Sequence, residues 1–215
     1  MKLNGIKANF LGDSITEGVG TTCHENTYHQ LIAKNCGLTV ARNYGISGTR
    51  FAKQYKLTVD NPRFDLDFCG RVDEMDADAE LIVVFGGTND FGHGDAPFGK
   101  FEDRTKDTFC GACHELMTKL INKYPDATIV IMTPLHRITE DEPSVGNARP
   151  LSDYVEMIKK TAEFYSLPVM DLWSASGIQP RVDIIKDKYC PDGLHPNDAG
   201  HAKMAERIGN FLLAL

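Results

Sequence analysis

The architecture of this chain follows from one short stretch near its start, Phe10-Leu11-Gly12-Asp13-Ser14. The segment 6–11 predicts a short buried strand, which stops abruptly at Gly12 and Ser14. Open α/β folds place their sites at the carboxyl edge of the sheet, so a strand that ends here carries the serine hydroxyl to that edge. Serine also caps helices and turns in many proteins. The stretch therefore indicates a catalytic serine only if a base and an orienting acid lie elsewhere in the chain.

Strand-like and helix-like segments alternate along the rest of the sequence. Residues 81–85 are continuously apolar, which is typical of a central parallel strand buried on both faces. Further strands are predicted at 38–43, 128–132 and 168–172, and helices at 27–36, 101–123, 151–165 and 196–215. This alternation predicts a three-layer α/β/α fold, in which helices cover both faces of a parallel sheet. Because there is no internal repeat and no linker, we expect residues 1–215 to form a single domain.

Four segments are predicted to be irregular for most of their length. Residues 49–80 combine proline, glycine and an acidic run, and we expect loops with one short helix at most. The glycine-rich segment 91–100 and the polar segment 136–150 are predicted to be loops, and residues 173–191 are predicted to be irregular.

The composition is that of an ordinary globular protein, since 42% of the 215 residues are hydrophobic and 25% are charged. The formal net charge is −7 and no stretch concentrates Lys and Arg, which argues against a nucleic-acid partner. No apolar run approaches the length of a membrane span, and residues 1–9 lack the apolar core of a signal peptide. We therefore expect a cytoplasmic protein without membrane insertion, whose six cysteines are reduced thiols. A homo-oligomer is compatible with this composition.

A second informative stretch lies near the end of the chain, Asp192-Gly193-Leu194-His195-Pro196. An aspartate and a histidine three residues apart can share one turn, with a glycine between them and a proline that starts a helix. The carboxylate can then accept a hydrogen bond from one imidazole nitrogen while the other nitrogen faces outward. The same residues could simply decorate the start of a helix. Together with Ser14, however, they supply a nucleophile, a base and an orienting acid, the minimum set for acyl transfer.

Candidate donors for an oxyanion follow three of the predicted strands. Acyl transfer develops negative charge on the carbonyl oxygen, and two or three fixed donors must bind it. The backbone amides of Ser14 and Gly48 and the side-chain amide of Asn89 each lie just beyond a predicted strand. Asn89 followed by Asp90 is also typical of a turn without chemistry.

Four short sequence blocks follow one another along the chain: Gly12-Asp13-Ser14, Asn43-Tyr44-Gly45-Ile46-Ser47-Gly48, Gly87-Thr88-Asn89-Asp90 and Asp192-Gly193-Leu194-His195-Pro196. In content and order they resemble the four conserved blocks of the SGNH (GDSL-type) hydrolase family. The first block continues with isoleucine where the family name has leucine, which leaves the serine in place. The resemblance implies a flavodoxin-like sheet of five parallel strands. It implies Ser14 as the nucleophile, His195 as the base and Asp192 as the orienting acid. It also implies oxyanion donors at Ser14, Gly48 and Asn89.

Two other patterns suggest different functions. The stretch Cys110-Gly111-Ala112-Cys113-His114 matches the C-x-x-C-H pattern of haem attachment, and a C-x-x-C pair also suggests redox or zinc chemistry. Both cysteines fall on the apolar stripe of the predicted helix 101–123, and no second cysteine pair completes a zinc site, so core packing is favoured. Glycines at 18–20 and 86–87 would suit a flavodoxin-like module that binds a phosphate or a nucleotide. The chain lacks a P-loop lysine and a full G-x-G-x-x-G, which argues against that function.

We therefore expect a serine esterase that needs no cofactor and acts on a small-molecule ester. The segments expected to rim the site, 92–100 and 136–152, are mostly polar or rich in proline and glycine. An acetyl or similarly short acyl group on a small polar or carbohydrate alcohol is favoured, because a long chain needs an apolar groove. A thioesterase or a lysophospholipase of the same family is the alternative enzyme. Four residues in loops expected near the site are candidates for substrate contact, namely Arg50, His93, His136 and Arg137. The alternative for each is an ordinary solvated loop side chain.

Overall fold

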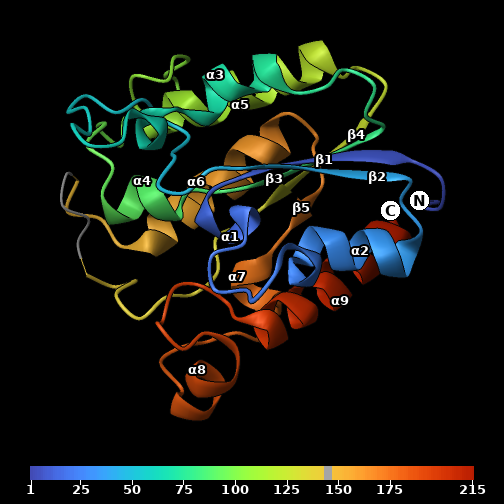
Figure 1. Cartoon of the computed structure of the whole chain (residues 1–215). Coiled ribbons are helices and arrows are strands. Elements are labelled where there is room, and N and C mark those ends of the chain that lie inside the picture. The colour runs from blue at the N-terminus through green and yellow to red at the C-terminus, as the bar shows by residue number, and fades with distance from the viewer. Residues whose placement is uncertain (143–146) are drawn as a thin grey trace.

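Five parallel strands form the central sheet in the part of the chain that the computed structural model describes, residues 1–142 and 147–215 (Figure 1). They are β1 (Lys7–Gly12), β2 (Val40–Gly45), β3 (Leu81–Phe85), β4 (Thr128–Met132) and β5 (Val169–Met170). Their order across the sheet is β2-β1-β3-β4-β5, and all neighbouring pairs are parallel. The flavodoxin-like architecture expected from the sequence is confirmed.

Helices cover both faces of this sheet (Figure 1). One face carries α3 (Phe68–Arg71), α5 (Phe109–Lys123) and α6 (Leu151–Phe164). The other carries α2 (Tyr28–Cys36), α7 (Leu172–Ala175) and α9 (Asp198–Ala214). The remaining described helices are α1 (Ser14–Glu17), α4 (Thr88–Gly92) and α8 (Asp183–Tyr189), with short 3₁₀ turns at His24–Asn26, Pro62–Asp65 and Val72–Glu74. Among the described residues, no helix combines the length and the apolar character needed to cross a membrane.

The central strand β3 contributes to both hydrophobic cores. Ile82 and Val84 pack with the cluster under α5 and α6, whereas Leu81, Val83 and Phe85 pack with the cluster under α2 and α9. Successive side chains of a strand point to opposite faces, which produces this division. Fully burying each such side chain contributes about 1.5–3 kcal/mol. The predicted central strand at 81–85 is confirmed.

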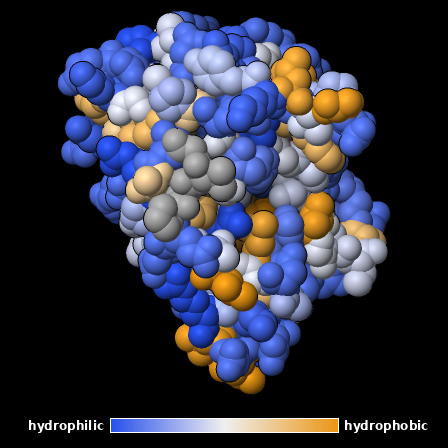
Figure 2. All heavy atoms as spheres, turned by 90° about the vertical axis from the view of Figure 1, so that its left-hand side faces the viewer, coloured by the Kyte–Doolittle hydropathy of each residue, from blue (hydrophilic) through white to orange (hydrophobic). Residues whose placement is uncertain are grey.

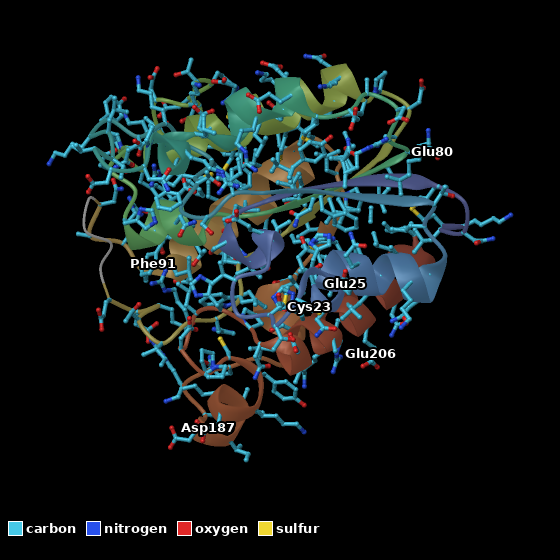
Figure 3. The ribbon with its side chains drawn as sticks, viewed as in Figure 1. Cys23, Glu25, Glu80, Phe91, Asp187 and Glu206 are labelled. Carbon is cyan, nitrogen blue, oxygen red and sulfur yellow. The ribbon has the colours of Figure 1, made fainter. Side chains whose placement is uncertain are left out.

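The carboxyl ends of three strands lie level at one edge of the sheet. Gly12 at the end of β1 pairs with both Gly45 of β2 and Phe85 of β3. Figure 3 shows the two edges: Glu80 immediately precedes β3 at one edge, and Phe91 in α4 lies at the opposite edge. The segments that follow β1, β2 and β3 are therefore brought together at the carboxyl edge.

Some element boundaries differ from the sequence-based prediction. The helix predicted at 101–123 begins only at Phe109, because the hydroxyl of Thr108 accepts a hydrogen bond from the Gly111 N–H and caps the helix there. The strand predicted at 168–172 is confined to the two residues that pair with β4. The segment 173–191 is not irregular throughout, since it contains α8 and most of α7. Residues 143–146 of the predicted loop 136–150 lie outside the described residues.

The segment 49–80 also contains more regular structure than predicted. It holds α3 and the 3₁₀ turns Pro62–Asp65 and Val72–Glu74. Two side chains cap these elements: that of Asp67 accepts a hydrogen bond from Gly70, and that of Asn61 accepts one from Arg63. Such capping depends on one side chain and leaves no hydrophobic period in the sequence.

The inward faces of the long helices largely follow the predicted stripes. Cys110 and Cys113 are buried on α5, as the core-packing interpretation predicts. The helix predicted at 196–215 ends at Ala214, and Leu215 beyond it is 48% exposed.

Candidate active site

Three polar side chains from opposite ends of the chain form a line at the carboxyl edge of the sheet. The Oγ atom of Ser14 lies 2.9 Å from Nε2 of His195, and Nδ1 of His195 lies 2.7 Å from Oδ2 of Asp192. An ionised carboxylate can only accept, so Nδ1 of the neutral ring carries the proton and Nε2 offers its lone pair to the serine hydroxyl. The line therefore has the geometry of a nucleophile, a general base and an orienting acid.

The turn that holds Asp192 fixes its carboxylate against the histidine. Oδ1 of Asp192 accepts hydrogen bonds from the backbone N–H groups of Leu194, at 2.8 Å, and His195, at 2.6 Å. Partial burial alone would raise the pKa of Asp192, but the hydrogen bonds from His195 and Leu194 outweigh it and hold the pKa below its usual range. Gly193 has φ +78°, and a Cβ there would lie 2.3 Å from a carbon of Ile138, so the turn requires glycine.

Ser14 is placed by the short helix α1, which begins immediately after β1. Oδ1 of Asp13 accepts a hydrogen bond from the Ile15 N–H at 3.0 Å and caps this helix. Burial raises the pKa of Asp13 to about 6, against the lowering effects of that hydrogen bond and of the nearby charge of His195. A Cβ on Gly12 would lie 1.9 Å from Oγ1 of Thr16, so glycine lets α1 approach the end of the strand.

Gly48 lies in the loop that follows β2, and polar groups hold this loop on two sides. Oε2 of Glu17 accepts hydrogen bonds from both the N–H and the hydroxyl of Ser47. Nη1 of Arg50 donates to the carbonyl oxygen of Gly48 at 3.1 Å. Gly48 itself has φ +76°, a conformation that residues with a Cβ adopt at a cost.

Asn89 stands in the first turn of α4, directly beyond β3, and is 6% exposed. Its Nδ2 donates one hydrogen to the carbonyl oxygen of Thr49 at 3.0 Å. The second hydrogen has no acceptor among the described residues. Asn89, Ser14, Gly48 and His195 all line one cavity of about 500 Å³. The structure thus brings together every residue for which the sequence predicted a catalytic or oxyanion role.

Sequence reasoning missed two residues that hold these loops, Glu17 and Arg71. Nη1 of Arg71 donates to the carbonyl oxygen of Gly12 at 3.1 Å and to Oγ1 of Thr49 at 2.9 Å, and Nη2 donates to the carbonyl oxygen of Tyr44. This buried guanidinium ties the serine turn to the loop after β2. Burial lowers the pKa of Arg71 to about 10. Neither residue belongs to a motif, so no pattern in the sequence marks it.

The four predicted substrate contacts fall into two groups. Arg50 and His93 line the cavity beside Ser14. His136 and Arg137 do not line it. Nδ1 of His136 lies 2.8 Å from Oε2 of Glu140, and Arg137 is bonded to Thr88.

Solved structures of other proteins share this fold over their whole length. A protein from Lactobacillus plantarum is 29% identical, with a TM-score of 0.84 and coverage of 98% of each chain. The lipase/acylhydrolase from Enterococcus faecalis is 18% identical, with a TM-score of 0.67 and coverage of 97% of this chain and 96% of that one. The aryl esterase of M. smegmatis is 17% identical, with a TM-score of 0.69 and coverage of 98% of this chain and 100% of that one. No curated protein sequence matches.

The sequence itself matches a known protein family along most of its length. The match is to the GDSL-like Lipase/Acylhydrolase family and runs over residues 10–203, from β1 into α9. It includes Ser14, Gly48, Asn89, Asp192 and His195. This chain is therefore a member of the GDSL-like lipase/acylhydrolase family.

Proposed function

We propose that the protein is a serine esterase with Ser14 as nucleophile, His195 as general base and Asp192 as the acid that orients the base. The observation that carries this proposal is the 2.9 Å separation of Ser14 Oγ and His195 Nε2, together with the contact between the Asp192 carboxylate and the other nitrogen of the same ring. Such a line has little structural value at a partly exposed position, whereas it is what a hydroxyl needs to act as a nucleophile.

The proposed reaction has two halves. Ser14 Oγ attacks the ester carbonyl carbon while Nε2 of His195 takes its proton, and Asp192 stabilises the resulting imidazolium. The N–H groups of Ser14 and Gly48 and the free amide hydrogen of Asn89 bind the oxyanion. His195 then returns the proton to the leaving alcohol. In the second half a water molecule attacks the acyl-enzyme while His195 accepts a proton from it. The bond between the acyl carbon and Ser14 Oγ then breaks, His195 returns the proton to Oγ, and the carboxylic acid is released.

A fluorophosphonate probe tests the proposal directly. It phosphonylates a serine only where a base activates the hydroxyl and donors stabilise the charge that develops on the phosphoryl oxygen. We expect one label per chain, located on Ser14 by peptide mass spectrometry. A folded protein that takes up no label, or takes it up at another serine, would contradict the proposal and favour a non-catalytic module with a flavodoxin-like fold.

The walls of the cavity support a short acyl group and a polar alcohol. Apart from Val19, Phe64 and Leu194, every side chain that lines it is polar, and one position is glycine. Gln54, Thr58 and other polar groups would suit hydroxyls of a carbohydrate or of another small alcohol. Figure 2 shows the same face of the molecule as mostly hydrophilic, with separate hydrophobic patches. We therefore favour acetyl esters over the long-chain substrates of a lysophospholipase or an acyl thioesterase.

Acyl-chain length gives the first prediction about specificity. Each methylene that contacts an apolar wall gains about 0.8 kcal/mol, which is close to fourfold in affinity. Only three of the side chains that line the cavity are apolar, namely Val19, Phe64 and Leu194. We expect kcat/KM for p-nitrophenyl esters to be highest for acetate or propionate and to fall for longer chains. The esters are compared below the concentration at which they form micelles. A steady rise through octanoate would show that an apolar groove exists and that the short-acyl proposal is wrong.

The pH dependence follows from the proposed base. We expect kcat/KM to fall at low pH, because protonated His195 cannot accept the serine proton. The lowered pKa of Asp192 keeps its carboxylate ionised over this range. Burial raises the pKa of Asp13 to about 6, so an Asp13→Asn variant serves as the control. The decrease in kcat/KM at low pH should persist in that variant. A kcat/KM that does not change between pH 5 and pH 9 would exclude a histidine base.

A further inference from the structure

One line of hydrogen bonds runs beside the proposed oxyanion donors and takes no part in the proton transfers above. Nη1 of Arg50 donates to Nδ1 of His93 at 3.0 Å. Nε2 of His93 lies 3.2 Å from Oδ1 of Asn89, whose Nδ2 donates to the carbonyl oxygen of Thr49 at 3.0 Å. Arg50 is only 3% exposed, and both of its terminal nitrogens donate to protein partners. The line joins the loop after β2 to helix α4.

The groups at its two ends fix the direction of every bond in this line. A guanidinium can only donate, so Nδ1 of His93 must be the unprotonated nitrogen. A backbone carbonyl oxygen can only accept, so the amide nitrogen of Asn89 must face Thr49 and its Oδ1 must face His93. The His93 ring therefore carries its proton on Nε2 and donates it to Oδ1 of Asn89. Both ring nitrogens are then engaged by protein groups, which leaves neither for a substrate.

This direction decides what Asn89 presents to the cavity. With Oδ1 held by His93 and one hydrogen held by Thr49, the remaining Nδ2 hydrogen is available to an anion beside Ser14. A flipped amide would present oxygen lone pairs instead and would repel the oxyanion. His93 and the Thr49 carbonyl together oppose that flip.

The same guanidinium also acts on the second donor. Nη1 of Arg50 donates to the carbonyl oxygen of Gly48 as well as to His93, and Nη2 donates to the carbonyl oxygen of Phe64 at 3.0 Å. Gly48 occupies the left-handed region of φ, where a glycine has many alternatives. The bond from Arg50 restricts the loop to the conformation in which Gly48 lines the cavity together with Ser14 and Asn89.

We propose that Arg50 and His93 are positioning residues of the oxyanion hole, which hold the Asn89 amide and the Gly48 loop in the orientation that binds the anion. This role rests on the proposed function, because only acyl transfer develops the oxyanion. The positive charge of Arg50 polarises the His93 ring and so strengthens the hydrogen bond that His93 donates to Asn89, since consecutive hydrogen bonds in a buried environment strengthen one another. Partial burial and the charges of Arg50 and Arg137 lower the pKa of His93, which keeps the ring neutral as the line requires.

The first test is the tautomer of His93, which does not depend on enzymatic activity. Long-range ¹H–¹⁵N correlation spectra of the ¹⁵N-histidine-labelled protein distinguish a protonated from an unprotonated ring nitrogen. We expect the His93 signals to report a proton on Nε2 and none on Nδ1 at neutral pH. A proton on Nδ1, or on both nitrogens, would overturn the proposal.

The second test is a double-mutant cycle between His93 and Asn89. Loss of the hydrogen bond in His93→Ala should lower kcat about tenfold, with little change in KM, because the Asn89 amide is then free to turn. In an Asn89→Ala background the same change should alter kcat by less than about twofold, since the residue through which it acts is gone. His93→Gln can still donate to Oδ1 of Asn89, and we expect it to restore kcat to within about threefold of the unaltered protein.

The outcomes of the cycle separate the two proposals. If Asn89→Ala leaves kcat unchanged, both the oxyanion role of Asn89 and the positioning role of His93 are wrong. If Asn89→Ala lowers kcat but His93→Ala lowers it by the same factor in both backgrounds, only the positioning role is wrong. His24→Ala, a change at an exposed histidine that does not line the cavity, serves as the control and should leave kcat unaltered. Should His93→Ala fail to fold, a tenfold loss in His93→Gln would still contradict the proposal.

Discussion

Ser14→Ala should abolish ester hydrolysis while the protein keeps its fold. The hydroxyl is the only group in the proposed mechanism that can form the acyl-enzyme, and loss of the nucleophile in comparable triads costs on the order of a million-fold in kcat. The side chain is small and its main contact is with His195, so the free energy of unfolding should change little. The measurement is kcat with p-nitrophenyl acetate, together with the midpoint of thermal unfolding.

A matched control for this change is Ser174→Ala. Ser174 is an exposed serine in α7, away from the cavity, and its replacement should preserve both turnover and fluorophosphonate labelling. Residual turnover in Ser14→Ala within about tenfold of the unaltered protein would mean that Ser14 is not the nucleophile.

The second large effect is expected from Asn89→Ala. The side-chain amide is proposed to bind charge that exists only in the transition state, so its loss should lower kcat by on the order of a hundred- to a thousand-fold and leave KM nearly unchanged. Asn89→Asp keeps the size of the side chain but removes both amide hydrogens, and we expect a loss at least as large. A variant that raises KM and keeps kcat would identify Asn89 as a contact for the bound ester instead.

The parts of the fold that were predictable are those with local signals. Each strand that leads to the site is a short apolar run that ends at a glycine or a polar turn, and both properties are visible within about ten residues of sequence. The same holds for Asp192 and His195, which meet within a single turn. The pairing of Ser14 with His195 was suggested by their residue types, which together make up the minimum set for acyl transfer, and the resemblance of the two stretches to blocks of one family strengthened it.

The parts that were not predictable depend on contacts between distant residues. Half of the residues that line the cavity come from the segment 47–64. Of the segments that the sequence favoured as its rim, 92–100 contributes His93, and the described part of 136–152 contributes none. The segment 47–64 shows no hydrophobic period, and buried arginines hold it in place. Arg50 donates to the carbonyl oxygens of Gly48 and Phe64, and Arg71 donates to the hydroxyl of Thr49. The identity of such an arginine is visible in the sequence, but its partners are known only once the chain has folded.

The separation of Ser14 and His195 along the chain has a consequence for how activity appears during synthesis. The two residues are 181 positions apart, and the base follows nearly all of the core-forming elements. A growing polypeptide can pair β1 with β2 and β3 long before the histidine has been added, so it can acquire most of its sheet while it is chemically inert. Appearance of hydrolysis in a translation reaction therefore reports that the segment carrying His195 has been synthesised and has packed beside the turn that follows β1.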